Sequence, residues 1–390
     1  MKPSFRRDRI TWLAYFGLAY YAYLEAVLGP IMPFLRDELK MSYSVTGLHF
    51  SAMAVGTILG GVTVDAVVNR RGRRMALWGG GVGMALGVLV LAAGLHAAVT
   101  IVGTFLMGFL GCFVINTAQA IMSDKYGEMR TVAFSEANMM ASLGASMSPL
   151  LIWFFQEIDF GWRGAMYVMI ALWMVVLLRF RHEPLPEASA SAAEDPGTPG
   201  QPLPRIFWAY WLIVFLVVAV ERCMVFWGAE FLKDEGGLSK VDASSAMWLL
   251  FVAMLIGRFV ASRVARTRPT RSLMLITILV ATVGFPLFWL ASPVALRLLG
   301  LFITGLGLAN FFPMTMSLAA SAAPDQPDKA IGRAMLGSGL TTLIMPQLLG
   351  GIADQTDIQT AFGIVAVLLV SGAAMTVLAK RYSVRQVGVE

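Results

Sequence analysis

The sequence predicts an all-α integral membrane protein with twelve transmembrane helices in two pseudo-symmetric six-helix bundles. Its 390 residues are 57% hydrophobic and only 14% charged, whereas about a quarter of the residues in a soluble domain are charged. The apolar residues form blocks of about twenty, which is the length that a helix needs to cross the hydrocarbon core. A helix also satisfies its own backbone hydrogen bonds there. A duplicated sequence pattern, described below, predicts the two bundles.

Twelve apolar blocks follow one another along the chain. The first is too long for a cleaved signal peptide and lacks a cleavage site of small residues, so it predicts a permanent span. An even number of crossings places both termini on one side. We expect the spans near residues 12–35, 45–67, 74–94, 98–122, 131–155, 162–180, 206–232, 243–264, 272–291, 294–320, 330–352 and 360–380.

The basic residues predict the orientation. The termini and the loops on their side of the membrane hold 22 of the 30 Lys and Arg, so the positive-inside rule places both termini in the cytoplasm. The expected location is the plasma membrane, which is the inner membrane in a Gram-negative bacterium. The net charge of +6 therefore reflects topology. Short basic clusters at helix ends do not form a nucleic-acid-binding face.

The chain divides into two predicted halves. A proline-rich polar segment at 181–204 predicts a cytoplasmic linker between the bundles 1–180 and 205–390. Residues 34–38 (FLRDE) recur at 231–235 (FLKDE), and Pro149 recurs as Pro346, both at an offset of 197 residues. Two similar bundles around a central site at the bilayer midplane are typical of secondary transporters that work by alternating access.

The loop after the second predicted span carries a recognisable pattern. Residues 61–65 (GVTVD), followed by 70–74 (RRGRR), resemble the signature of the major facilitator superfamily, and the resemblance extends over essentially the whole chain. It implies the twelve-helix fold and secondary transport. More narrowly, residues 257–259 (GRF), Gly111 and Cys112 with 116–118 (NTA), and 312–318 (FPMTMSL) resemble the fucose–proton symporter branch.

Three ionisable residues lie near the predicted midplane. A charge at membrane depth is costly and is a functional candidate by default. We assign proton coupling to Glu25 and Glu221 and substrate binding to Arg222. Glu25 and Arg222 are 197 residues apart and occupy equivalent places in the two halves. They form either a pair that opens when Glu25 takes up a proton or a fixed ion pair that holds the bundles together.

Polar and aromatic side chains in the predicted spans complete the candidate substrate site. Amides orient a solute by hydrogen bonding, and tyrosine hydroxyls at membrane depth require a partner. The alternative role for the amides is hydrogen bonding between helices. The candidates are Asn116, Gln119, Asn138, Asn310, Gln347, Tyr20, Tyr21, Tyr23 and Phe226.

A second group of charged residues lies near the predicted cytoplasmic helix ends. An acid there can pair with cations on neighbouring helices and hold one transport state closed, whereas the alternative for the arginines is topology signalling or snorkelling. The gating candidates are Asp65, Arg70, Arg73, Arg74, Arg258 and Glu136.

Other functional classes are disfavoured. The P-loop pattern GxxxxGK followed by Ser or Thr is absent, as are HExxH and GxSxG. We therefore expect no enzyme, metal site or cofactor, and a proton gradient as the energy source. The expected function is proton-coupled symport of a small organic solute, a sugar or a carboxylate, by a monomer in the lipid bilayer. An exporter of lipophilic compounds, favoured by 24 methionines, and an uncoupled facilitator stay open as alternatives.

Overall fold

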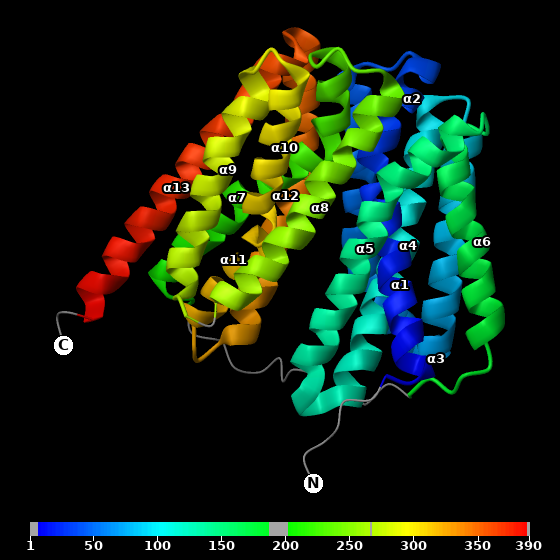
Figure 1. Cartoon of the computed structure of the whole chain (residues 1–390). Helices are drawn as coiled ribbons and strands as arrows, with labels where there is room; N and C mark the ends of the chain where they lie inside the picture. The colour runs from blue at the N-terminus through cyan, green and yellow to red at the C-terminus, as the bar shows by residue number, and fades with distance from the viewer. Residues whose placement is uncertain (1–6, 187–201, 266, 388–390) are drawn as a thin grey trace. The chain divides into compact units, whose positions relative to one another are not determined.

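The computed structural model describes residues 7–186, 202–265 and 267–387. All regular elements in these ranges are helices (Figure 1). They are α1 (Arg9–Ala26), α2 (Leu28–Leu39), α3 (Tyr43–Ala93), α4 (Ala97–Tyr126), the short 3₁₀ helix η1 (Gly127–Met129), α5 (Arg130–Glu157), α6 (Arg163–Phe180), α7 (Arg205–Asp234), α8 (Lys240–Val264), α9 (Thr270–Leu290), α10 (Val294–Leu308), α11 (Phe311–Ser321), α12 (Pro327–Gln355) and α13 (Ile358–Val387).

Eleven helical segments of the described chain are long and apolar enough to cross a membrane. One of them, α3, has 51 residues and would extend about 76 Å as a straight helix, far more than one crossing needs. Gly72 interrupts it with φ 78° and ψ 162°, values that glycine adopts without steric cost. The segment therefore contains the predicted second and third spans. The all-helical, multi-span prediction is confirmed.

The chain forms two compact units. Unit 1 comprises Met1–Met41 and Leu48–Thr198, and unit 2 comprises Ser42–Gly47 and Pro199–Glu390. Helix α3 is thus divided, because its first residues pack with unit 2 and the remainder with unit 1. Of the predicted linker 181–204, residues 187–201 lie outside the described ranges.

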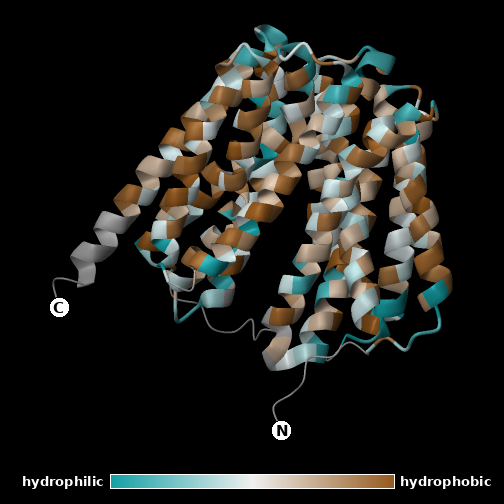
Figure 2. Cartoon of the chain, in the orientation of Figure 1, coloured by the Kyte–Doolittle hydropathy of each residue, from teal (hydrophilic) through white to brown (hydrophobic). Residues whose placement is uncertain are grey.

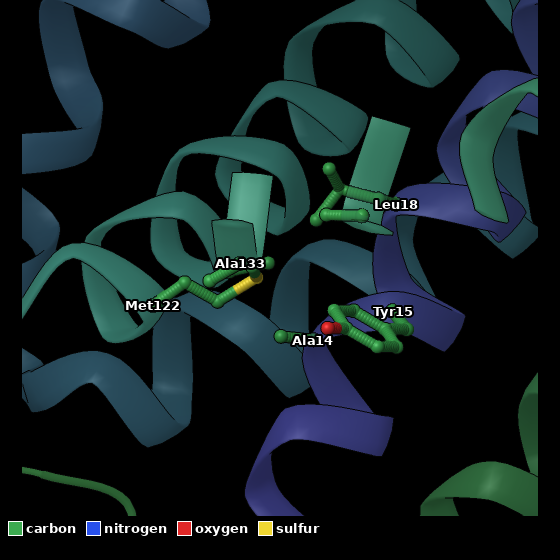
Figure 3. Packing of buried hydrophobic residues seen from close by; sticks show 7 residues of the cluster. Ala14, Tyr15, Leu18, Met122 and Ala133 are labelled. Carbon is green, nitrogen blue, oxygen red and sulfur yellow. The ribbon is translucent and has the colours of Figure 1, made fainter. Parts of the chain in front are cut away.

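The core of unit 1 contains helix α1 packed against α4 and α5. Figure 3 shows Ala14, Tyr15 and Leu18 of α1 gathered with Met122 of α4 and Ala133 of α5. Small residues let these helices approach closely, as is typical of membrane bundles.

Apolar side chains also cover the outside of the helices. Figure 2 shows hydrophobic residues along their lengths and hydrophilic residues mainly near their ends. Val62, Val283 and Leu178 are 77%, 66% and 60% exposed, respectively. Such side chains are expected where lipid, and not water, surrounds a helix.

Two of the predicted spans are interrupted, and each interruption has a proline nearby. The first span is divided at Val27, between α1 and α2, as Pro30 predicts, because a proline provides no N–H for the carbonyl of Ala26. The tenth span, expected as one helix over 294–320, is divided at Ala309 and Asn310. Pro313 explains this difference, since it cannot donate a hydrogen bond to the Ala309 carbonyl.

Candidate functional site

The interruption of the tenth span is joined to helix α8 by two reciprocal hydrogen bonds. Arg258 Nε donates to the carbonyl oxygen of Ala309 at 3.1 Å, which is the acceptor that Pro313 leaves available. Asn310 Nδ2 donates to the carbonyl oxygen of Gly257 at 3.1 Å. A methyl group on Gly257 would lie 2.6 Å from Ala309 Cβ and 2.7 Å from Leu306 O. The glycine therefore permits the close approach on which both bonds depend.

Helix α7 adds charged groups to this part of unit 2. Glu221 interacts electrostatically with Arg258. Arg222 places its guanidinium carbon 5.8 Å from the ring centroid of Phe226, one turn further along the helix, a cation–π distance. The structure thus brings together three of the predicted site residues, Glu221, Arg258 and Asn310, and separately pairs Arg222 with Phe226.

Arg258 illustrates what the sequence could not resolve. The sequence places it near a helix end, as a gating candidate, whereas in the structure its guanidinium is held at a helix interruption. Irregular backbone at membrane depth occurs where protein buries it or where it lines a cavity, and such breaks form substrate sites in transporters. The gating assignment of Arg258 stays a prediction.

The predicted amide ligands lie in different surroundings. Asn116 Nδ2 donates to the carbonyl oxygen of Cys112 at 2.8 Å and to its Sγ at 3.0 Å. The amide nitrogen therefore bonds to acceptors one turn earlier in its own helix. Gln119 and Gln347 are half-buried, and Asn138 is exposed. Their roles as solute ligands stay predictions.

The tyrosines of α1 pack inside unit 1. Tyr20 stacks on Trp173 of α6 with ring centroids 4.7 Å apart. Tyr23 donates its hydroxyl to Ala165 O at 2.7 Å. Tyr21 is buried, and a methyl group on Gly111 of α4 would lie 3.1 Å from its Cδ2 atom. These contacts give all three rings a packing role, which sequence periodicity could not distinguish from a role in a cavity.

Glu25 is half-buried near the end of α1. It belongs to unit 1 and Arg222 to unit 2, and their pairing stays a prediction.

The gating candidates of unit 1 include two residues with ion pairs. Arg73 is 8% exposed and donates to Asp124 Oδ2 at 2.5 Å. Asp65, Arg70 and Arg74 are exposed. Asp124, in the last turn of α4, was missed because only the tertiary structure places it opposite Arg73.

Glu136 of α5 accepts two hydrogen bonds from Arg7, at 2.7 and 2.6 Å. It also accepts one from the Tyr15 hydroxyl at 2.8 Å. This carboxylate therefore ties the segment before α1 to α5, and its gating role stays a prediction.

Sequence reasoning also missed two fully buried ionisable side chains. Glu230 of α7 and His49 of α3 are both 0% exposed. His49 Nε2 lies 2.7 Å from Thr100 Oγ1. Glu230 falls within the expected span 206–232, so a carboxyl group inside a predicted span could have identified it from the sequence. Among the residues that the structure describes, no cluster of three or more His, Cys, Asp or Glu could hold a metal ion.

Comparison with known proteins gives one family and several distant relatives. The family model described as Major Facilitator Superfamily matches residues 12–326 and 269–388. The chain is 21% identical to an uncharacterized MFS-type transporter of Yersinia pestis, over 96% of each chain. It is 26% identical to the hexuronate transporter of Bacillus subtilis (strain 168), over 67% of this chain and 66% of that protein.

Solved structures show the same fold. The nucleoside transporter NupG, as its D323A mutant, superposes with a TM-score of 0.77 at 14% identity and covers 95% of this chain and 98% of its own.

Proposed function

The chain belongs to the major facilitator superfamily, and from this premise we propose that it carries a small organic solute, a sugar or a carboxylate, by proton-coupled symport. The superfamily assignment makes it a multi-pass membrane transporter and not an enzyme. The solute class, the coupling ion and the residues that bind them are the proposal.

The observation that carries the solute class is the pair of half-buried arginines in the spans of unit 2. Arg222 offers a guanidinium beside the Phe226 ring, and Arg258 is tied to the interrupted tenth span. Arginine binds carboxylates through two parallel hydrogen bonds, and aromatic faces accept sugar rings. The similarity to a transporter of hexuronate, by name a sugar acid, supports a solute with both features.

The carboxyl groups support coupling to protons. Glu25 and Glu221 lie within predicted spans, where an ionisable residue is by default a candidate for a proton or ion pathway. In the proposed cycle, protonation of Glu25 frees Arg222 to bind the solute, and proton loss allows the ion pair to re-form. The resemblance to the fucose–proton symporters supports the same coupling.

Flux in proteoliposomes tests the proposal. The purified protein is reconstituted with a pH dye inside, and hexuronates, neutral sugars and simple carboxylates are offered with and without an imposed proton gradient. The expected result is solute-dependent acidification of the lumen, lost in Glu25→Gln, and solute binding weakened in Arg222→Ala. Solute equilibration without proton movement would identify an uncoupled facilitator, and flux of lipophilic compounds alone would identify an exporter.

A further inference from the structure

Glu230 lies on a stripe of helix α7 that is covered by a segment from the other half of the sequence. Trp227, Glu230 and Asp234 are spaced i, i+3 and i+7, which places them within an arc of about 60° on one face of a helix. Glu230 is 0% exposed, although it lies only one turn before the end of α7 at Asp234.

Tyr43 covers this stripe. Its ring centroid lies 6.0 Å from that of Trp227, and its hydroxyl donates to Asp234 Oδ2 at 2.6 Å. The side chain of Tyr43 thus reaches both ends of the stripe, and Glu230 is the residue between them. Tyr43 belongs to unit 2 through the short segment Ser42–Gly47.

Helix α12 holds this segment in place. Asp354 accepts the backbone N–H of Tyr43 at 2.7 Å and that of Ser44 at 2.8 Å. These are two of the N–H groups that the start of helix α3 leaves without an intrahelical acceptor. Trp227 Nε1 donates to Pro346 O at 3.1 Å. A methyl group on Gly350 would lie 2.7 Å from Tyr43 O, so the glycine admits the segment at close range.

We propose that Glu230 is a proton-binding site and that the segment Ser42–Gly47 controls its access to water. An ionisable residue within a membrane span is a candidate for proton transfer by default, and a carboxyl group exchanges its proton with the solution only when water reaches it. While Tyr43 covers the stripe, the proton on Glu230 is retained. When the segment leaves, the proton exchanges with the solution at the end of α7 that the positive-inside rule assigns to the outside. This inference rests on the coupling to protons proposed above.

The charged groups near this end of α7 come from several elements. On α7 itself, Lys233 and Asp234 lie 3.5 Å apart. Helix α8 begins with Lys240 and Asp242, and α12 contributes Asp354. Glu235 follows α7 and interacts electrostatically with Asp357, Arg297 and Asp234. Arg297 of α10 places its guanidinium 5.3 Å from the ring centroid of Phe231, the residue after Glu230. Helix α11 and residues 358–379 of α13 contain no charged residue. Glu230 and Asp234 are the two carboxyl groups of the stripe, and Glu230 is the buried one.

Carbodiimide labelling tests both parts of the proposal without a known solute, because these reagents attack protonated carboxyl groups. Dicyclohexylcarbodiimide, which partitions into the membrane, is expected to modify Glu230 in the wild-type protein, with labelling that falls as the pH rises. A water-soluble carbodiimide is expected to leave Glu230 unmodified in the wild type and to label it severalfold more in Tyr43→Ala. Tryptic peptides and mass spectrometry locate the adduct.

Glu235, in the turn after α7, provides an internal control, since its reaction with the water-soluble reagent should be the same in both proteins. Glu230→Gln should abolish the adduct in that peptide. If Tyr43→Ala does not fold, Asp354→Asn weakens the same cover. Labelling of Glu230 that is independent of pH, absent in every protein, or unchanged when the cover is weakened would overturn the proposal. If proton-coupled symport is wrong but this proposal is right, the proteoliposomes will show no solute-dependent proton flux, and the labelling of Glu230 will still depend on pH and on Tyr43.

Discussion

Units 1 and 2 differ in where they keep their charged groups. In unit 1, ion pairs lie near helix ends, as in Arg163 with Glu38 and Arg73 with Asp124. In unit 2, Glu230 and Arg297 are 0% and 6% exposed, and Arg258 is bound within the bundle. Ion pairs at helix ends tolerate water, whereas buried ionisable groups oppose folding and are retained for function. Unit 1 also contains buried ionisable side chains, His49 at 0% and Arg73 at 8% exposure, so the difference lies in the carboxyl groups: among the described residues, the fully buried carboxyl group, Glu230, belongs to unit 2.

The two interrupted spans, one in each unit, also differ between the units. Neither break recurs at the offset of 197 residues. Helix α7 is continuous at the position equivalent to Val27, and helix α4 is continuous at the positions equivalent to Ala309 and Asn310. The carbonyl freed in unit 2 is occupied by the Arg258 guanidinium. The predicted repeat is therefore not exact at the positions where backbone hydrogen bonding is incomplete.

The largest effect is expected for Arg258→Ala. It removes the donor to Ala309 O and the positive charge near Glu221, and leaving these groups without the guanidinium costs about 3 kcal/mol. We expect lower thermal stability in detergent and loss of flux. Arg163→Ala in unit 1, whose pair is about one-third exposed, should cost no more than about 1 kcal/mol. Equal losses would remove the distinction between the units.

Gly257→Ala should have the next largest effect. The added methyl would lie 2.6 Å from Ala309 Cβ, and overpacking of this kind costs about 1–3 kcal/mol. Gly332→Ala is the matched control, because nothing lies within 4 Å of a methyl group there, and alanine favours the helix. Thermal unfolding should separate the two variants. Similar melting temperatures would mean that α8 can move away from the break.

A smaller effect is expected for Arg73→Ala in unit 1. Asp124 is 32% exposed and Arg73 is 8% exposed, so water compensates part of the lost pair, and we expect a cost of about 1–2 kcal/mol. Arg74→Ala, an exposed neighbour, should have almost no effect on unfolding. A loss of flux without a loss of stability in Arg73→Ala would support the gating assignment.

The smallest effect concerns Asp8, which caps helix α1. Its Oδ1 accepts the backbone N–H of Thr11 at 3.0 Å and pairs with Lys125. Burial alone would raise the pKa of Asp8, but the bonds from Lys125 and Thr11 outweigh it and lower the pKa below its ordinary value.

A depressed pKa means that this stabilisation is present above the unfolded-state pKa and is lost as the pH falls through the lower folded-state value, below about pH 4. Asp8→Ala should cost about 1 kcal/mol at neutral pH, and the difference from wild type should vanish in acid. A melting-temperature difference that persists at low pH would contradict this role.

The sequence predicted the helical fold and the positions of the spans because these follow from local composition, whereas the break in the first span is explained by the backbone chemistry of Pro30. The break at Pro313 was available from the same rule but was obscured by an unbroken apolar run. The partners of Tyr20 and Tyr23 depend on how each helix is rotated within its bundle. The roles of Asp124 and Asp354 depend on partners that are distant in the chain, Arg73 and Tyr43. Glu230 was visible as a carboxyl in a predicted span, and only its burial distinguishes it.

The division of helix α3 has a consequence for recombination between relatives. Exchange of halves at the proline-rich linker would appear natural, yet it would separate Tyr43 from Asp234 and Asp354, which come from unit 2. A hybrid transporter made from two parents should therefore receive Ser42–Gly47 and residues 199–390 from the same parent. The part of the chain that must be exchanged as a whole is therefore discontinuous in sequence, because it includes six residues near the start of the chain.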